Sequence, residues 1–210
     1  MAKSKHDKIA ENLAKRFGSE YKKHKGIDTC GKSTQIALLA DKYPALVTTH
    51  EPGGTKFGKQ AREILLSDSL CSKRAELLLF LADRAEHYEE VVESNKDKTV
   101  ISDRGFLSGI GYALANGDFD FDELVALNKF ALKEHFPDKV ILFLTNMETL
   151  QQRTSEKELD GIELRGLEYL INVQQHMKES LEKLSIDYLE VDATDSIENI
   201  HQKILTYLKL

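Results

Sequence analysis

The sequence has little of what several classes of protein require. It contains only two cysteines, Cys30 and Cys71, and three prolines. Two cysteines exclude a disulfide scaffold and are too few for a zinc cluster. No apolar run approaches the roughly 18 residues of a membrane span, and the first 25 residues hold no apolar core of the secretory kind. We therefore expect a soluble, cytoplasmic protein without a membrane partner.

The charge is unevenly distributed along the 210 residues, whose net charge is −6. Eight basic and three acidic side chains give residues 1–25 a net charge of +5, which leaves −11 for residues 26–210. An acidic body offers no broad basic face to displace the counterions of a nucleic acid. We therefore do not expect a general nucleic-acid-binding protein.

From residue 26 onward, short β-rich runs alternate with longer helical patterns, as in a parallel sheet flanked by helices. A continuous apolar run at 140–144 is typical of a strand buried on both faces. The predicted strands are 46–49, 99–102, 140–144 and 188–191, and the predicted helices are 32–40, 57–66, 73–93, 121–134, 164–184 and 196–208.

The strongest motif is a phosphate loop that matches the pattern G-x-x-x-x-G-K-[ST] in full. It reads Gly26-Ile27-Asp28-Thr29-Cys30-Gly31-Lys32-Ser33-Thr34. Its two glycines let the backbone turn its N–H groups toward a phosphate, and the helix that follows adds its positive end. Lys32 is placed to reach phosphate oxygens, and Ser33 to bind Mg²⁺. The loop predicts ATP binding.

The residues ahead of this loop do not fit the pattern. A phosphate loop should follow a buried apolar strand, but residues 21–25 read Tyr-Lys-Lys-His-Lys. Burying unpaired lysines would cost several kcal/mol each. Either the first strand is missing, or it is distorted, or the chain start does not belong to this fold.

Other chemically active residues follow the predicted strands, where ligands bind in doubly wound sheets. Glu51-Pro52-Gly53-Gly54-Thr55 follows the first strand, and Asp103-Arg104 follows the second. Between them, Phe80 and Arg84 stand four residues apart and share one face of a predicted helix. Taken alone, Phe80 would be interpreted as a core residue, and Glu51, Arg84 or Asp103 as a cap or a surface partner.

Together these motifs resemble the thymidylate kinase family, and the resemblance covers the chain from Gly26 to its C-terminus. It implies an α/β fold of the P-loop nucleotide-kinase type, with three layers and a central parallel sheet between helices. It also implies transfer of the ATP γ-phosphoryl group to dTMP, with ATP and Mg²⁺ as cofactors. Members are usually homodimers, so we expect one here.

The resemblance implies a role for each matching residue. On the donor side, the phosphate loop with Lys32 would hold ATP, and Ser33 and Asp103 the metal. On the acceptor side, Phe80 would stack on thymine. The remaining implied contacts are Asp28 with the sugar and phosphate, Glu51 and Arg62 with the monophosphate, Arg84 and Tyr112 with the base, and Arg104 with the charge of the transition state. A packing role for Tyr112 is equally consistent with the sequence.

A lid is expected after the strand at 140–144, over residues 151–163, which are polar and rich in charge. No arginine occupies Thr29 or Cys30 in the phosphate loop, and in the resembled family that absence implies that the lid supplies the catalytic cation. Arg153 is the first candidate and Arg165 the second. A plain solvated surface segment is the alternative.

Residues 1–25 lie outside the resemblance. Ile9, Leu13 and Phe17 recur every four residues, which predicts a short amphipathic helix with a basic face. It could be an exposed extension, a surface for a partner, or a segment foreign to the kinase domain at 26–210. Two alternatives to a thymidylate kinase stay open: another nucleoside monophosphate kinase, or a nucleotide-binding protein whose catalysis is impaired.

Overall fold

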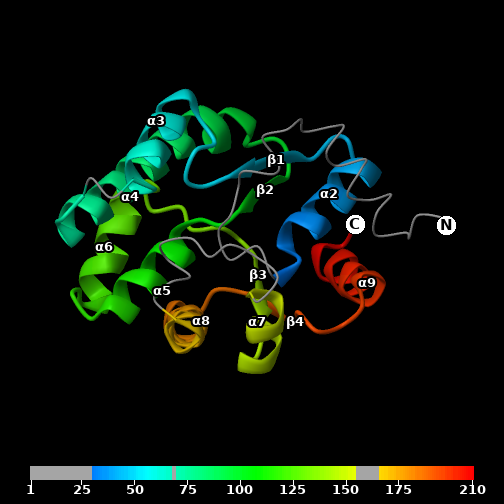
Figure 1. The fold of residues 1–210 in the computed structure, drawn as a ribbon. Coiled ribbons are helices and arrows are strands. Elements are labelled where there is room, and N and C mark those ends of the chain that lie inside the picture. Colours follow the sequence, from blue (N-terminus) through cyan, green and yellow to red (C-terminus); the bar gives the residue numbers. More distant parts are fainter. Residues whose placement is uncertain (1–29, 68–69, 155–165) are drawn as a thin grey trace.

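The computed structural model describes residues 30–67, 70–154 and 166–210, with the backbone alone at 152–154 (Figure 1). In chain order the helices and strands are α2 (Lys32–Lys42), β1 (Val47–His50), α3 (Lys56–Leu65), α4 (Lys73–His87), the π-helical turn η3 (Tyr88–Val92), the 3₁₀ turn η4 (Glu93–Asn95), β2 (Val100–Asp103), α5 (Phe106–Asn116), α6 (Phe121–Ala131), β3 (Val140–Leu144), α7 (Met147–Thr154), α8 (Leu167–Leu184), β4 (Tyr188–Asp192) and α9 (Ile197–Leu208).

The strands form two parallel pairs. In β1–β2, Val47 lies opposite Val100, and in β3–β4, Val140 lies opposite Tyr188. The α/β class, the parallel strands and all four strand positions are thus confirmed. The prediction of one central sheet differs from the described residues, which form two two-stranded sheets. Any strand before α2 falls in residues 1–29, outside the described part of the chain.

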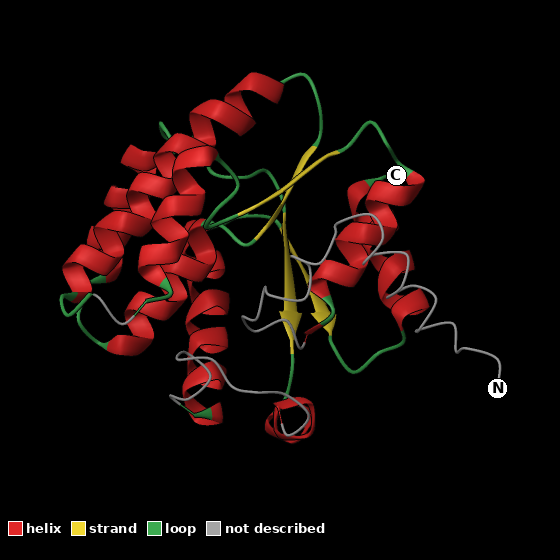
Figure 2. Cartoon of the chain, turned by 45° about the horizontal axis from the view of Figure 1, so that its top comes forward, coloured by secondary structure: helices red, strands yellow, loops and turns green. Residues whose placement is uncertain are grey.

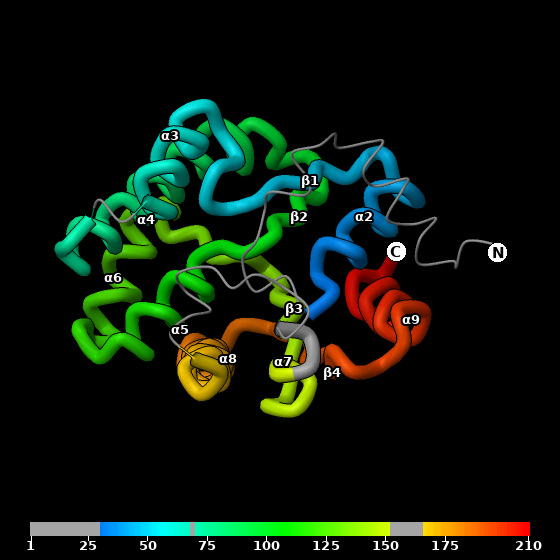
Figure 3. Tube along the Cα trace, viewed as in Figure 1, coloured from blue at the N-terminus to red at the C-terminus, as the bar shows by residue number. Residues whose placement is uncertain are grey.

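Helices cover both sides of these strands, and Figure 2 shows the three layers. One apolar core, which includes Ile110, Leu124 and Leu181, packs the strands against α4, α5, α6 and α8. The second core, which includes Leu39 and Ile204, packs them against α2 and α9. Figure 3 shows α2 and α9 side by side although they are far apart in the sequence.

Short polar residues begin most of the predicted helices. Thr55, Ser72, Asp120 and Ser196 each precede a helix and accept a hydrogen bond from a backbone N–H of its first turn. Such caps satisfy donors that have no partner within the helix. These residues explain why α3, α4, α6 and α9 begin within a residue of the positions that the sequence predicts.

Two predicted helices end earlier than expected. The helix predicted to reach residue 93 is α-helical only to His87 and then continues as the π-helical and 3₁₀ turns. The helix predicted to reach residue 134 stops at Ala131, because Lys133 and Glu134 take positive φ angles of 48° and 68°. Two further helices, α5 and α7, were not predicted at all.

Strand β3 is less buried than its sequence predicts. Only Leu142 of Val140–Leu144 is buried, and the other four residues are half-buried. On the edge away from β4, no described strand pairs with β3. The expectation of a strand buried on both faces is therefore not met by the described residues.

Among the described residues, no helix combines the length and the apolar character needed to cross a membrane.

Replacing Leu124 by Ala tests the larger core. Leu124 has no exposed surface, so the substitution leaves a cavity, and we expect the free energy of unfolding to fall by about 2–5 kcal/mol. Urea unfolding measures this loss. The control is Leu78→Ala, because Leu78 on α4 is 58% exposed and its loss should stay within about 0.5 kcal/mol. Equal effects of the two variants would contradict the assigned core.

Candidate active site

The start of α2 and the end of β2 meet at one place. Gly31, just before α2, has φ 82°, a conformation that glycine adopts without strain. Two residues later, the hydroxyl of Ser33 donates a hydrogen bond to Oδ2 of Asp103 at 3.0 Å. The structure therefore brings the end of the phosphate loop next to the carboxylate of Asp103, the last residue of β2. Residues 26–29 of the loop lie outside the described residues.

The oxygens of this pair fit a magnesium ion. Oδ1 of Asp103 is buried and has no hydrogen-bond partner, and a hydroxyl beside a carboxylate is the donor set that Mg²⁺ prefers. Among the described residues, no group of three or more His, Cys, Asp or Glu side chains could hold a metal. An ion on Ser33 and Asp103 would thus keep positions for water and substrate oxygens.

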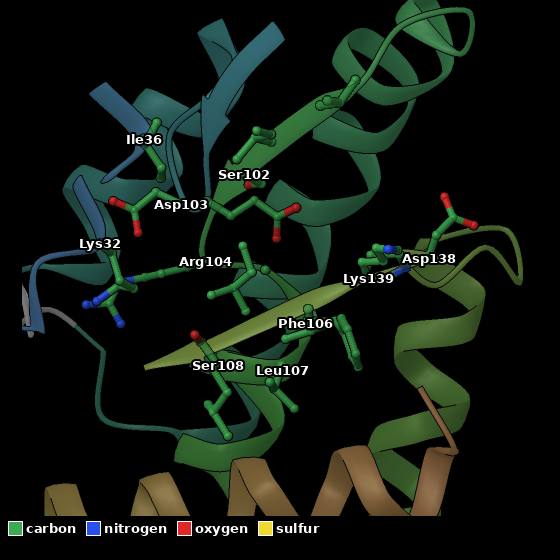
Figure 4. A pocket seen from close by; sticks show the side chains of 18 of the residues that line it. Lys32, Ile36, Ser102, Asp103, Arg104, Phe106, Leu107, Ser108, Asp138 and Lys139 are labelled. Atoms are coloured by element: carbon green, nitrogen blue, oxygen red, sulfur yellow. The ribbon is translucent and has the colours of Figure 1, made fainter. Parts of the chain in front are cut away.

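Cationic side chains lie around the same place. Lys32, Asp103 and Arg104 line a cavity of about 1060 Å³ that residues of β2 and β3 also line, and we call it the interstrand cavity. Figure 4 labels these three side chains. Arg104 has φ 74°, a strained conformation for a residue with a Cβ that costs about 1–3 kcal/mol. Such strain persists where surrounding structure imposes it and is typical of ligand sites.

A buried ion-pair network holds the loop after β1. Glu51 is only 8% exposed, and its Oε2 accepts a hydrogen bond from Nε of Arg84 at 2.9 Å. Its Oε1 lies 3.0 Å from Nδ1 of His87, while Nε2 of the same ring lies 2.7 Å from the hydroxyl of Thr49. Arg84 also donates from Nη1 to Oδ1 of Asn128 at 2.8 Å. Loop, α4, β1 and α6 therefore meet at one carboxylate.

The glycines of the loop allow it to lie close to these groups. A Cβ on Gly54 would lie 2.6 Å from the carbonyl oxygen of His50 and 2.7 Å from the ring of His87. The N–H of Gly53 donates to Oδ1 of Asp83 at 3.1 Å. Arg62 on α3 donates to the carbonyl oxygen of Pro52 at 3.0 Å. The backbone of residues 51–54 is thus held on both sides.

The two carboxylates on this loop and α4 have opposite pKa shifts. Burial alone would raise the pKa of Glu51, but the charges and hydrogen bonds of Arg84 and His87 outweigh it, so its pKa is lowered. Burial raises the pKa of Asp83, and the hydrogen bond from Gly53 only partly opposes it. Glu51 therefore stays ionised, and its negative charge keeps the guanidinium of Arg84 in place.

The three residues expected at the base lie on α4 and α5. Arg84 is buried, whereas Phe80 and Tyr112 are half-buried. The ring of Tyr112 lies 6.2 Å from that of Tyr169 on α8, a distance typical of packed aromatic pairs. The packing role that the sequence left open for Tyr112 is thus seen here, and it does not exclude contact with a ligand.

Sequence reasoning missed His87, Thr49 and Asn128 as members of the network around Glu51. His87 follows Arg84 by three residues on the same helix, so its place on the Arg84 face was a usable signal. For Asn128 the sequence held no such signal, because its contact with Arg84 joins two helices that are distant in the sequence.

The lid prediction falls mostly outside the described residues. Residues 151–154 form the end of α7, so this part of the expected lid is helical. Arg153 lies in that helix, but its side chain is outside the described set, as are residues 155–165 with Arg165. Both arginines stay candidates for the catalytic cation.

Replacing Glu51 by Gln tests the network. The lowered pKa of Glu51 means that its stabilising effect is present above its usual pKa of 4.5 and is lost as pH falls through the lowered value. Asp83, with a raised pKa, acts in the opposite sense: its contribution is lost as pH rises from its usual 3.8 through the raised value. We expect Glu51→Gln to lower the free energy of unfolding near neutral pH by about 3–5 kcal/mol and to remove only the part of the wild-type decline in acid that Glu51 contributes, because Asp192 and Asp195 also have lowered pKa values.

Urea unfolding from about pH 3 to pH 7 measures both effects. The control is Glu86→Gln, which removes an exposed carboxylate from the same helix and should change stability by less than about 0.5 kcal/mol. If the Glu51 variant lost no more stability than the Glu86 variant, the network would not stabilise the loop.

Comparisons with known proteins agree with this geometry. The family model described as "Thymidylate kinase" matches residues 25–204. The thymidylate kinase of Sulfurovum sp. (strain NBC37-1) is 80% identical over 185 residues, which cover 88% of this chain and 97% of that protein. The thymidylate kinase of Campylobacter jejuni subsp. doylei is 51% identical over 189 residues, with the same coverage.

A solved structure shares the fold. The crystal structure of thymidylate kinase from Ehrlichia chaffeensis superposes with a TM-score of 0.67 at 23% identity and covers 86% of this chain and 93% of that chain. At this identity the likeness shows the fold alone. The family match over residues 25–204 and the relative at 80% identity are stronger evidence, and they show that the chain belongs to the thymidylate kinase family.

Proposed function

We propose that this chain transfers the γ-phosphoryl group of ATP to dTMP, giving ADP and dTDP for the synthesis of dTTP. Family membership over residues 25–204 supports the reaction. The observation that carries the proposal is the Ser33–Asp103 pair at the start of α2, with Lys32 and Arg104 beside it. Phosphoryl transfer depends mainly on positioning and on positive charge around the phosphates, and this arrangement supplies both.

On the donor side, residues 26–34 would hold ATP. The N-terminal end of α2 offers unpaired backbone N–H groups and a partial positive charge to phosphate oxygens, and Lys32 adds a full charge. Ser33 and Asp103 would hold Mg²⁺, which neutralises phosphate charge when bound. The hydrogen bond between these two side chains keeps both oxygens close together before any nucleotide arrives.

On the acceptor side, the loop at 51–55 would face the monophosphate of dTMP. Arg62 of α3 donates a hydrogen bond to the carbonyl oxygen of Pro52 in this loop and would supply a cation there. Phe80 would stack on thymine, and such stacking contributes about 1–3 kcal/mol per base. The remaining proposed contacts to dTMP and to the transferred group are those of Asp28, Glu51, Arg84, Arg104 and Tyr112.

The role of Glu51 follows from its contacts. Both of its oxygens are engaged by Arg84 and His87, so its carboxylate positions the guanidinium and the loop. Nη1 of the Arg84 guanidinium donates a further hydrogen bond to Oδ1 of Asn128. A fixed guanidinium loses little entropy when it binds a base, which favours selective recognition.

Three further features are proposed with this function. Residues 151–163 would form a lid that brings Arg153, or else Arg165, to the transferred phosphoryl group. Residues 26–210 would be the kinase domain and residues 1–25 a basic extension, since the family match begins at residue 25. A cytoplasmic location is proposed from the sequence, and a homodimer is proposed because the family resemblance implies one.

A second candidate function is nucleotide binding with impaired catalysis. The specific observation in its favour is the run Tyr-Lys-Lys-His-Lys at 21–25, together with the division of the described strands into two separate pairs. A phosphate loop without a supporting strand would hold nucleotide in a poorly fixed position, and misplacement by about 1 Å can cost 100-fold in rate.

A coupled assay of ADP release separates these functions. We expect the protein with Mg·ATP to turn over dTMP in preference to dUMP, dGMP and AMP. A version with an apolar strand in place of residues 21–25 is measured beside it. Turnover by the repaired version alone would support the impaired-enzyme alternative, and a preference for another monophosphate would support a different nucleotide kinase.

Replacing Asp103 by Asn tests the donor side. The variant removes the charge beside Ser33, so we expect kcat to fall by about 100-fold or more while the KM for dTMP changes little. The control is Asp118→Asn, since Asp118 is exposed and should leave kcat within about twofold. A large rise in KM with unchanged kcat would contradict the assigned role.

Replacing Arg153 by Ala tests the lid. If Arg153 supplies the catalytic cation, kcat falls by about 100-fold or more, whereas Arg165→Ala lowers it far less. Steady-state kinetics at saturating ATP and dTMP measure both variants. The reverse order of effects would assign the cation to Arg165, and unchanged kcat in both would remove the lid from catalysis.

A further inference from the structure

Asn128 on α6 is a buried polar residue next to the proposed acceptor site. It is only 1% exposed, and helices α4, α5 and α6 lie beside one another (Figure 1). Asn128 is not one of the residues proposed to contact a nucleotide, yet it is bonded to one of them, Arg84. A buried amide needs partners for both its donor and its acceptor, so the partners that it has indicate its role.

The amide of Asn128 is held in one orientation. Its Nδ2 donates to the carbonyl oxygen of Leu124, one helical turn earlier, at 2.7 Å. Its Oδ1 accepts a hydrogen bond from Nη1 of Arg84 at 2.8 Å. Because an arginine side chain carries donors and no acceptor, only the oxygen of the amide can take this contact. The two hydrogen bonds therefore agree, and they fix the acceptor of Asn128 on the guanidinium.

The guanidinium of Arg84 is bounded on three sides. Its Nε donates to Oε2 of Glu51 at 2.9 Å, and its Nη1 donates to Asn128. On the third side lies Gly109 of α5, where an added Cβ would be 3.3 Å from Nη1 and 3.4 Å from Nη2. The guanidinium therefore cannot turn far without losing a hydrogen bond or approaching the backbone of α5.

The remaining nitrogen of this guanidinium is available to a ligand. In the part of the chain that the structure describes, no hydrogen bond of Arg84 involves Nη2. This atom is also not among the fully buried polar atoms that lack a partner, so part of its surface is open. Nη2 carries two N–H donors, and an acceptor on a bound molecule would satisfy them.

The position of Arg84 relates this nitrogen to the proposed base site. Phe80 precedes Arg84 by one turn on α4, and Tyr112 follows Gly109 by three residues on α5. Residues at these spacings share a helix face. The guanidinium therefore lies between the two helix faces that carry the rings proposed to contact the base.

A fixed guanidinium can reject a base, whereas a mobile one can adapt to it. Thymine presents a carbonyl oxygen at the ring position where cytosine presents an amino group. A donor held opposite an amino group leaves both groups without an acceptor, and such a mismatch weakens binding strongly. If the guanidinium could turn away, the mismatch would cost less and the selectivity would fall.

We propose that Asn128 is a positioning residue for base recognition, which acts by holding Arg84 in the orientation that discriminates between bases. This inference rests on the proposed function, because it requires Arg84 to contact the base. Asn128 itself does not touch the nucleotide. Its loss should therefore change the choice between nucleotides more than the rate of phosphoryl transfer.

Replacing Asn128 by Ser removes its contact with Arg84, since the shorter side chain does not reach Nη1. The serine hydroxyl can still bond the carbonyl oxygen of Leu124, as Ser180 bonds that of His176 at 2.6 Å. Asn128→Asp is the conservative variant: it keeps an oxygen for Nη1, and its neutral form can donate to Leu124. Asn128→Leu fills the volume and is the second disruptive variant if the serine variant does not fold.

The control is Ser180→Ala. Ser180 is also 1% exposed, but its hydrogen bond lies within α8. This substitution therefore removes a buried polar contact without touching Arg84. It should leave the kinetic constants and the selectivity within about twofold of the wild type.

Steady-state kinetics with dTMP and dCMP at saturating Mg·ATP measure the effect. We expect the wild type to prefer dTMP by about 100-fold or more in kcat/KM. Asn128→Ser and Asn128→Leu should lower this ratio by about tenfold and raise the KM for dTMP, with kcat for dTMP within about threefold. Asn128→Asp should keep the ratio within about threefold of the wild type. Titration calorimetry of both nucleotides gives the same ratio without turnover.

The outcomes separate this proposal from the proposed function. If the wild type prefers dTMP and both disruptive variants keep that preference, the positioning role is overturned and the proposed function stands. The same holds if they lower kcat equally for both nucleotides, which is the result of a purely structural role, or if Asn128→Asp loses as much selectivity as Asn128→Ser. A wild type that binds dCMP as tightly as dTMP would overturn the inference and the proposed function together.

Discussion

A carboxylate buried in a protein interior must be paired, and the loop at 51–55 and the helices around it are arranged to meet that requirement at Glu51. Arg84 and His87 reach it from α4, and the histidine ring in turn contacts Thr49 on β1. Removing any one partner would leave a charge in a medium that solvates it poorly. The loop after β1 and helix α4 therefore keep one relative position, and α6 joins them through Asn128.

Helix α2 is joined to its neighbours by both polar and apolar contacts. A hydrogen bond from Ser33 to Asp103 links α2 to β2, and Gln35 of α2 donates to the carbonyl oxygen of Ile197 at the start of α9. Leu39 of α2 packs in the second apolar core together with Ile101 of β2 and Ile141 of β3. Placement of the ATP phosphates in the proposed site would therefore depend on these contacts of α2.

The elements that the sequence predicts well are those whose signal is local. All four strands match because each is a short β-rich run, and four helices begin at capping residues such as Ser72 and Asp120. Helix α5 was not predicted because Phe106–Asn116 carries no charged residue and so shows no polar face. The pairing of Glu51 with His87 joins separate elements, which periodicity does not reveal. The Ser33–Asp103 contact agrees with the expectation that both residues bind one metal ion. That expectation came from the phosphate loop and from the Asp103-Arg104 motif.

The remaining disagreement between sequence and structure lies at one place. The five apolar residues of β3 are typical of a strand buried on both faces, yet only Leu142 is fully buried and β3 pairs only with β4 among the described residues. The sequence ahead of the phosphate loop is basic where such a neighbour would have to be apolar. Natural sequences are usually consistent at every level, so a local conflict of this kind marks a functional or a compromised position. Here the conflict coincides with the edges of β2 and β3, next to the residues proposed to hold ATP, so the support of these two edges would affect both stability and catalysis.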